Sequence, residues 1–277
     1  MTTTSPPGRR HGSGDVRESP VEPEPEIEEA FDRLVDEGST RLARPWATLL
    51  ATGLLGGLDV GTGVLAYLLV EHATGSQLLA GLAFSIGFVA LLLARSELFT
   101  ENFLVPVAAV VAARDTVWSL LRLWGATLAL NLVGGWGFTW LVVRAFPDLL
   151  DTARAAGTHY AQLGVSVRSL ALAVLAGVVI TLMTRMQHAT ESLGVQLVPA
   201  VLFGALLAAG GLFHSVLDSL LMFAALHAGS VPFGYADWAG ALAWSVFGNL
   251  LGGVGLVTFI RLVRVPHRVA EERRRNT

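Results

Sequence analysis

The sequence predicts an all-α membrane protein with six transmembrane helices, arranged as two inverted three-helix repeats in which helices 2 and 5 are broken. Composition is the first reason, because 53% of the 277 residues are apolar, 15% are charged and the mean hydropathy is +0.58. The second is that several apolar blocks reach the roughly 20 residues that cross about 30 Å of hydrocarbon. These two observations exclude an ordinary soluble domain. The third reason is an internal repeat, which predicts that the two halves of the chain form related, inverted units.

The polar ends of the chain flank the apolar blocks. Residues 1–25 are rich in Pro, Gly, Ser and charge, which predicts a disordered tail. Residues 26–44 carry apolar side chains at helical spacing and predict an amphipathic cytoplasmic helix. Residues 46–263 form the predicted transmembrane pore domain, and 264–277 a basic cytoplasmic tail. The blocks are 46–70, 78–94, 118–143, 167–186, 195–209 and 238–263.

The arginines predict the orientation in a bacterial inner (plasma) membrane. They gather near both ends of the chain, at Arg41 and Arg44 and again from Arg273 to Arg275, so both termini are expected in the cytoplasm. The loops 71–76 and 228–237 contain no arginine and are expected outside. A long outer loop is expected over 144–166, although it contains basic residues.

Two of the six blocks are interrupted. The second block meets the charged run Arg95-Ser-Glu-Leu-Phe-Thr-Glu-Asn102, and each charge would cost about 2.5–3.5 kcal/mol in a continuous lipid-facing helix. The fifth block meets Gly210-Gly-Leu-Phe-His214, where paired glycines precede a polar residue. Both interruptions predict a helix that breaks inside the membrane.

An internal repeat connects the two breaks. Asn131-Leu-Val-Gly-Gly135 recurs as Asn249-Leu-Leu-Gly-Gly253, and Leu98-Phe-Thr100 recurs as Leu212-Phe-His214, at offsets of 118 and 114 residues. The repeats cover about 46–143 and 166–263, and three passages in each require the halves to insert in opposite directions. Irregular backbone at mid-membrane is tolerated only where it lines a cavity, so we expect a cavity between Thr100 and His214. Half-helix N-termini at that cavity favour an anion or an electron-rich solute.

The repeated segments also carry a family resemblance. Phe84-Ser-Ile-Gly87, Leu98-Phe-Thr100, Gly211-Leu-Phe-His-Ser215 and Gly248-Asn-Leu-Leu-Gly-Gly253 resemble signature segments of a less characterised branch of the formate/nitrite transporters. The resemblance covers residues 46–263 and implies an aquaporin-like bundle in a homopentamer with one pore per protomer. It also implies that Thr100 faces a central His214. The implied substrate pathway comprises Thr100, His214, Phe84, Phe88, Leu98, Phe99, Leu207 and Phe213.

This chain departs from that pattern at three positions. Phe213 stands where relatives carry Glu before the histidine, Asp218 where they carry Asn four residues after it, and Gly177 where they carry Asn in helix 4. The departures leave the substrate's identity open. The expected supporting polar residues are Asn131, Asn249, Ser215, Asp218, Arg95 and Glu97.

Each polar residue also has a purely structural interpretation. His214 could bond a backbone carbonyl at the break, and Thr100 could satisfy loop amides. The asparagines are expected to bond across packed helices or to the broken segments, and Arg95 to pair with Glu97. Asp59 and Asp218 remain open between proton transfer and simple packing. We expect no metal site, because His188 and Glu191 alone are insufficient and fit a solvated turn.

The favoured function is a channel or transporter for small monovalent anions of weak acids, such as formate or nitrite. Since a bare carboxylate crosses a dry constriction at high cost, proton linkage at His214 is expected. The alternatives are a pore for neutral small solutes and a non-conducting structural or regulatory pentamer. No His-Glu-x-x-His or Gly-x-Ser-x-Gly pattern lies inside a passage, so an enzyme is not expected. The expected partners are the anion, protons, identical subunits and membrane lipid, with no cofactor and no nucleic acid.

Overall fold

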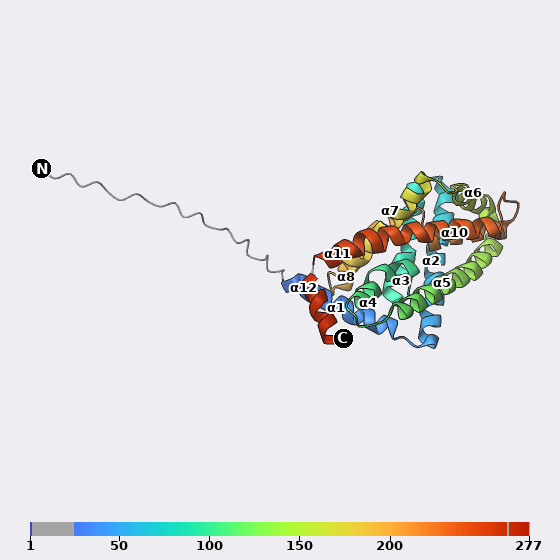
Figure 1. Cartoon of the computed structure of the whole chain (residues 1–277). Coiled ribbons are helices and arrows are strands. Elements are labelled where there is room, and N and C mark those ends of the chain that lie inside the picture. Colours follow the sequence, from blue (N-terminus) through green and yellow to red (C-terminus); the bar gives the residue numbers. More distant parts are fainter. Residues whose placement is uncertain (2–24, 265, 277) are drawn as a thin grey trace.

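The computed structural model describes Met1, residues 25–264 and residues 266–276, and every regular element in these ranges is helical (Figure 1). Apart from Met1 and Pro25, the predicted disordered tail lies outside the described residues. The elements are α1 (Pro25–Leu42), α2 (Trp46–Thr74), α3 (Gln77–Ala94), the 3-10 helix η1 (Phe99–Phe103), α4 (Val105–Val111), α5 (Val117–Ala145), the 3-10 helix η2 (Pro147–Leu149), α6 (Leu150–Ala161), α7 (Val167–Gln187), α8 (Leu193–Ala209), α9 (Ser215–Ala228), α10 (Tyr235–Leu250), the π-helical η3 (Leu251–Thr258), α11 (Phe259–Val263) and α12 (Pro266–Asn276).

Five of these helices are long and apolar enough to cross a membrane. They are α2, α3, α5, α7 and the continuous run Tyr235–Val263 that joins α10, η3 and α11. Only 28% to 50% of the most apolar window of each is buried inside the chain, so the remaining surface is available to lipid or to neighbouring copies. Three further apolar helices are shorter, at Phe99–Val111, Leu193–Ala209 and Ser215–Ala228.

Hydroxyl side chains fix where three of the long helices begin. Ser76 accepts a hydrogen bond from the Leu79 amide, and Thr116 accepts one from the Ser119 amide. Ser166 and Ser169 exchange bonds in both directions, which satisfies two amides at the start of α7. These caps set the helix boundaries within a few residues of the apolar blocks.

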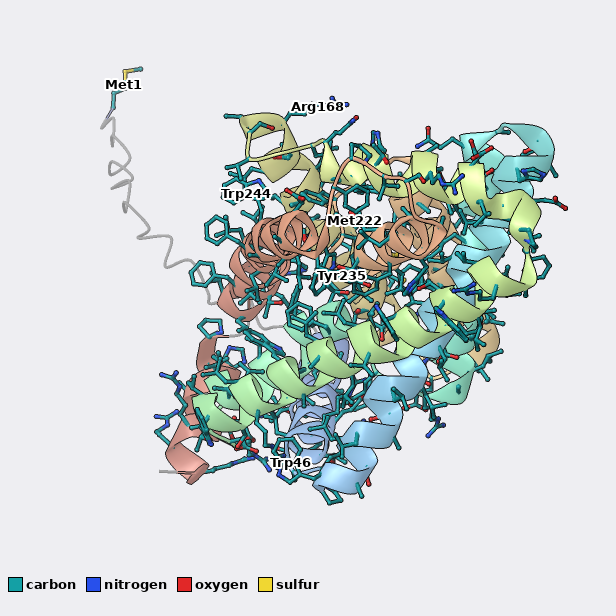
Figure 2. The ribbon with its side chains drawn as sticks, turned by 90° about the vertical axis from the view of Figure 1, so that its right-hand side faces the viewer. Met1, Trp46, Arg168, Met222, Tyr235 and Trp244 are labelled. Carbon is teal, nitrogen blue, oxygen red and sulfur yellow. The ribbon has the colours of Figure 1, made fainter. Side chains whose placement is uncertain are left out.

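The long helices pack in pairs around one core. α2 contacts both α3 and α5, α3 contacts α8, and α7 contacts α10. Figure 2 shows α2 and α5 side by side, with Trp46 and Arg168 toward opposite ends of the molecule. The breaks after α3 and α8 both lie in the buried core, where Leu98 and Phe213 are 0% and 2% exposed.

The segment predicted as a long outer loop contains a helix instead. Residues 150–161 form α6, which packs on α9 so closely that a side chain at Gly157 would collide with Ala225. Ala153 and Tyr160 are buried on the packed face. The helix escaped the sequence analysis because it is short and only one side of it is apolar.

The two terminal helices lie together at one end of the molecule, called here the α1 end, whereas α6 lies at the other (Figure 1). Phe31 and Val35 of α1 pack against Ala108 and Ala112, beside Leu262 and Val269. Arg268 pairs with Asp32, which ties the basic C-terminal segment to α1. That segment therefore includes a docked helix, α12.

Candidate functional site

Asn131 of α5 holds the backbone that follows α3 and enters η1, here called the Asn131 segment (residues 95–100). α3 ends where Arg95 adopts a left-handed conformation, with φ of 54°. The Asn131 side-chain oxygen accepts from the Phe99 amide at 2.9 Å, and its nitrogen donates to the carbonyls of Gly53 and Glu97 at 2.8 Å each. One buried side chain thus satisfies an amide and a carbonyl that a continuous helix or water would otherwise pair, and its bond to Gly53 links them to α2.

Asn249 holds the backbone between α8 and α9 in the same way. This Asn249 segment (residues 210–216) begins at Gly210 and turns at Gly211, whose φ is +58°. The Asn249 oxygen accepts from the Ser215 amide at 3.0 Å, and its nitrogen donates to the carbonyls of Phe213 and Ala173 at 2.9 Å each. Gly177 packs against the Asn249 carbonyl so closely that a Cβ would collide.

These matched bonds correct the register inferred from the sequence. Phe99 corresponds to Ser215 and Glu97 to Phe213, an offset of 116 residues, whereas the Leu-Phe-Thr and Leu-Phe-His match gave 114. His214 therefore occupies the position of Leu98, and Thr100 corresponds to Val216. The sequence match gave the wrong offset because each asparagine binds a backbone amide and backbone carbonyls. These atoms are the same for every residue type, so the residue identities do not report the register.

The two segments bring Thr100 and His214 into contact. The Thr100 hydroxyl oxygen lies 2.8 Å from His214 Nε2, and both residues are 0% exposed. His214 Nδ1 accepts from the Leu217 amide at 3.1 Å, so the ring hydrogen is on Nε2 and is donated to Thr100. This leaves the Thr100 hydroxyl hydrogen to donate to a further group.

Two other predicted residues, Asp218 and Ser215, lie beside this pair. Asp218 Oδ2 accepts from the His214 amide at 2.7 Å and so helps to cap α9. Neither Asp218 Oδ1 nor the Ser215 hydroxyl has a hydrogen-bond partner among the described residues, although both are buried. Unpaired buried polar atoms cost free energy unless water or a solute binds them, so they mark a place for one.

The predicted aromatic and aliphatic pathway residues are all buried. Phe84 and Phe88 meet edge to face at 5.5 Å, while Leu98 and Leu207 are 0% exposed. The remaining two, Phe99 and Phe213, are each in contact with another ring: Phe99 packs against Phe103 and Trp124, and Phe213 stacks on Tyr160 at 6.3 Å. The sequence analysis missed Tyr160 because it lies in α6.

A charged cavity of about 470 Å³ opens at the α1 end, and we call it the vestibule. The predicted ion pair between Arg95 and Glu97 was wrong. Glu97 pairs with Arg44, whereas Arg95 is exposed. Glu97 is only 2% exposed, so Arg44, which follows α1, neutralises a charge inside the loop. The charged and histidine residues that line the vestibule are Arg33, Glu37, Arg41, Arg44, Arg95, Glu97, Glu101, His188 and Glu191.

α1 reaches across the vestibule to α7. Glu37 lies 3.0 Å from His188 Nε2, and His188 Nδ1 lies 2.8 Å from the Thr184 carbonyl, so each ring nitrogen has an oxygen partner. His188 is therefore not in the purely solvated turn that the sequence predicts. Burial opposes ionisation of Glu37, but the hydrogen bond from His188 and the charge of Arg41 lower its pKa from 4.5 to about 2. Among the described residues, no three acidic or histidine side chains form a metal site.

Comparison with known proteins identifies the architecture. Residues 28–263 match the sequence pattern of the family described as formate/nitrite transporter. The chain belongs to the formate/nitrite transporter family. It is 26% identical over 259 residues to the inner membrane protein YfdC of Escherichia coli (strain K12), covering 88% of this chain and 80% of that protein. The family resemblance inferred from the sequence is thus confirmed, together with a membrane location.

Two solved structures show that the formate/nitrite transporter fold extends over most of the chain. An FNT family ion channel superposes with a TM-score of 0.75 at 17% identity, covering 86% of this chain and 99% of that one. A structure described as a pentameric formate channel with formate bound superposes with a TM-score of 0.63 at 21% identity, covering 78% of this chain and 96% of that one. These similarities confirm the all-helical membrane fold.

Proposed function

We propose that this protein is a membrane channel or transporter for small monovalent anions of weak acids, such as formate or nitrite. The observation that carries the proposal is the buried contact between Thr100 and His214, 2.8 Å apart where the Asn131 and Asn249 segments meet. The family membership and the formate described in one structural neighbour support the same substrate class. Because His214 donates its Nε2 hydrogen to Thr100, the Thr100 hydroxyl can donate its own hydrogen to an oxygen atom of a passing solute.

The proposed architecture has six passages, made by two oppositely inserted repeats of about 46–143 and 166–263 in an aquaporin-like bundle. α3 with α4 and α8 with α9 would form the two broken passages, and both termini would lie in the cytoplasm of a bacterial inner membrane. The matched bonds of Asn131 and Asn249 support the repeat. The exposed apolar surface of the spans and the pentameric neighbour support a homopentamer with one pore per protomer.

The proposed path runs from the vestibule to the Thr100–His214 pair between apolar constrictions. Phe84, Phe88, Leu98 and Leu207 would form these constrictions, with Phe99 and Phe213 beside them. Since Arg41 and Arg44 pair with Glu37 and Glu97, the exposed Arg95 would be the group that attracts anions to the vestibule. Ser215 and Asp218, with their unpaired oxygens, would bind water or solute next to the pair.

Proton linkage follows from the free-energy cost of moving a charged anion through the apolar constrictions. A neutral acid crosses apolar surroundings far more easily than a carboxylate, so the anion would cross together with a proton exchanged at His214. Since His214 Nδ1 accepts the Leu217 amide, protonation there requires that bond to be released. The N-cap of α9 would therefore be coupled to transport.

The test is uptake of formate, nitrite and similar monoanions into liposomes at two pH values, with His214→Asn as the variant. Asparagine keeps a side-chain acceptor for the α9 N-cap but does not present the imidazole Nε2 to Thr100. We expect uptake to be faster at the lower pH, and to fall about tenfold or more and lose its pH dependence in the variant, because a buried donor is removed. Unchanged uptake and pH dependence in a well-folded variant would contradict the proposal.

One observation also favours a pore for neutral small solutes. The Thr100–His214 contact is made by a hydroxyl and a singly protonated ring, so no cation is required at this point. Liposome swelling with formate and with neutral solutes of similar size separates the two functions. A pore for neutral solutes would pass only the latter at neutral pH, and a non-conducting pentamer would pass neither.

A further inference from the structure

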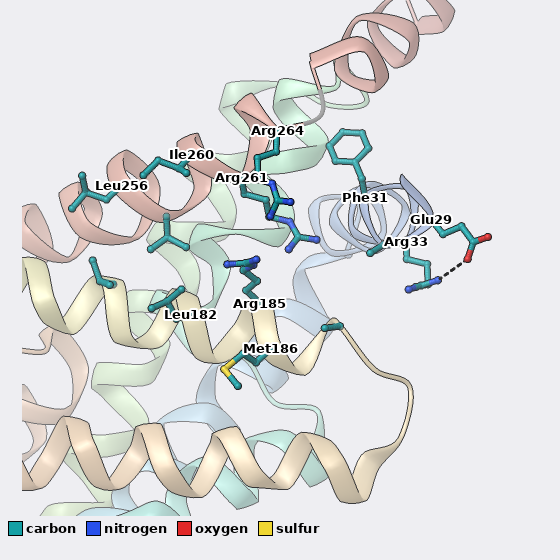
Figure 3. A pocket seen from close by; sticks show the side chains of 14 residues that line it. Glu29, Phe31, Arg33, Leu182, Arg185, Met186, Leu256, Ile260, Arg261 and Arg264 are labelled. Carbon is teal, nitrogen blue, oxygen red and sulfur yellow. Dashed lines mark ion pairs between the residues drawn. The ribbon is translucent and has the colours of Figure 1, made fainter. Parts of the chain in front are cut away.

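We infer that the α1 end carries a binding site for an anionic phospholipid, separate from the proposed transport path. The site is a cavity of about 920 Å³ between α1, α7 and the helical run that ends with α11. Its polar part contains the guanidinium groups of Arg185, Arg261 and Arg264, which gather from facing helices (Figure 3). The vestibule is a separate, neighbouring cavity, and Ala30 and Arg33 of α1 line both.

The three arginines lack counter-charges within the described part of the chain. None of them forms an ion pair with another described residue. The one acidic residue lining the cavity, Glu29, lies 3.9 Å from Arg33 (Figure 3). Three crowded guanidinium groups repel one another, and the two free oxygens of a lipid phosphate relieve that repulsion while accepting hydrogen bonds from them.

The apolar wall identifies the ligand as a lipid. Leu182 and Met186 of α7 face Leu256 and Ile260 of the opposite run across the cavity (Figure 3). Leu256 and Ile260 are 48% and 59% exposed, and both belong to a helical run long and apolar enough to cross the membrane. A ligand with a phosphate at the arginines and hydrocarbon along this wall matches both halves of the site, whereas free phosphate uses only one.

The position along the helices matches the level of lipid headgroups. Arg185 lies in the last turn of α7, and Arg261 lies in the last turn of α11. Both helices belong to candidate spans, so their ends are expected near the membrane surface. Basic pockets between such helix ends are suited to anionic lipid headgroups.

The experiment measures binding of phosphatidylglycerol and of phosphatidylcholine with identical acyl chains to the full-length protein in detergent, by native mass spectrometry. The test variant is Arg185→Gln/Arg261→Gln. Its control is Arg144→Gln/Arg168→Gln, which removes the same charge from two exposed arginines away from the α1 end: Arg168 is at the opposite end (Figure 2), and Arg144 is in the last turn of α5, just before η2 and α6. We expect phosphatidylglycerol affinity to fall about 25-fold in the test variant, at about fivefold for each arginine, and less than twofold in the control. Phosphatidylcholine binding should stay the same in both.

Arg264→Gln keeps the test valid if the double variant folds poorly, because Arg264 is exposed. It should weaken phosphatidylglycerol binding about fivefold. Glycerol phosphate, added at the same concentration, should not displace the lipid. Full displacement would identify a free phosphate site and overturn the proposal, as would an equal loss of affinity in the opposite-end control.

Two other occupants have distinct signatures. If a second copy of the chain fills the cavity, the double variant changes the oligomeric mass and leaves phosphatidylglycerol affinity unchanged. If the acidic stretch of this chain fills it, neutralising Asp15, Glu18, Glu22 and Glu24 in the full chain lowers stability as much as Arg185→Gln/Arg261→Gln does, and neither variant changes phosphatidylglycerol affinity. Either result would overturn the inference.

Discussion

The Asn131 and Asn249 segments share a scaffold but not their surroundings. Each asparagine makes the same three backbone bonds, and each is fully buried. At the position where the first segment has Glu97, paired with Arg44 beside a charged vestibule, the second has Phe213, stacked on Tyr160 under α6. The backbone geometry is therefore repeated, whereas the chemistry at the two ends differs.

The contacting pair does not follow the repeat. Thr100 corresponds to Val216, and His214 corresponds to Leu98, so each segment contributes one polar group from a position that is apolar in the other. A symmetric scaffold thus supports an asymmetric pair. This separates residues that hold the backbone from residues available to a solute, and variants at matched positions can test the separation.

The largest expected effect concerns the shared scaffold. Asn131→Ala and Asn249→Ala should each lower the free energy of unfolding by about 3 to 5 kcal/mol, because each leaves a buried backbone amide and a buried carbonyl unpaired where the helix is interrupted. Equilibrium unfolding in mixed detergent measures this. Thr52→Ala serves as control, since that hydroxyl bonds to Thr48 in its own helix. Markedly unequal losses for the two asparagines would break the equivalence of the segments.

The next effect concerns the buried ion pair between Glu97 and Arg44, which only the Asn131 segment has. Arg44→Gln leaves Glu97 buried without its partner and should cost roughly 3 kcal/mol of stability. Arg44→Gln/Glu97→Gln should recover most of that loss, because the buried charge is removed as well. The same unfolding assay compares them. A double variant no more stable than Arg44→Gln alone would show that the ion pair does not account for the difference.

A smaller effect separates the pair from the scaffold. Thr100→Val removes one hydroxyl at nearly constant volume and should slow formate uptake into liposomes about tenfold. Val216→Thr adds a hydroxyl at the matched position and should change uptake less than twofold. If both variants slowed uptake equally, the asymmetric pair would have no special role in transport.

The sequence predicted the parts of this comparison that depend on local patterns. The apolar blocks gave most helix boundaries, and the Asn-Leu-x-Gly-Gly repeat pointed to both asparagines. It could not give the register of the segments, because Asn131 and Asn249 bind backbone atoms that any residue supplies. It also missed Arg44 as the partner of Glu97, since the two residues are 53 positions apart and meet only in the folded chain. α6 and Tyr160 were missed because a short helix with one apolar face has little hydropathy signal.

The smallest expected effect tests whether the pH dependence of uptake arises in the vestibule, at Glu37, or at the Thr100–His214 contact. The pKa of Glu37 is lowered from 4.5 to about 2, so any stability its ionised form contributes is present above about pH 4.5 and is lost as pH falls toward 2. Glu37 therefore stays charged between about pH 5 and 7.5. Glu37→Gln should change uptake less than twofold, because a half-exposed pair contributes at most about 1 kcal/mol, and should leave the pH dependence intact. If Glu37→Gln abolished the pH dependence and His214→Asn preserved it, the proton-sensing group would lie in the vestibule rather than at the Thr100–His214 contact.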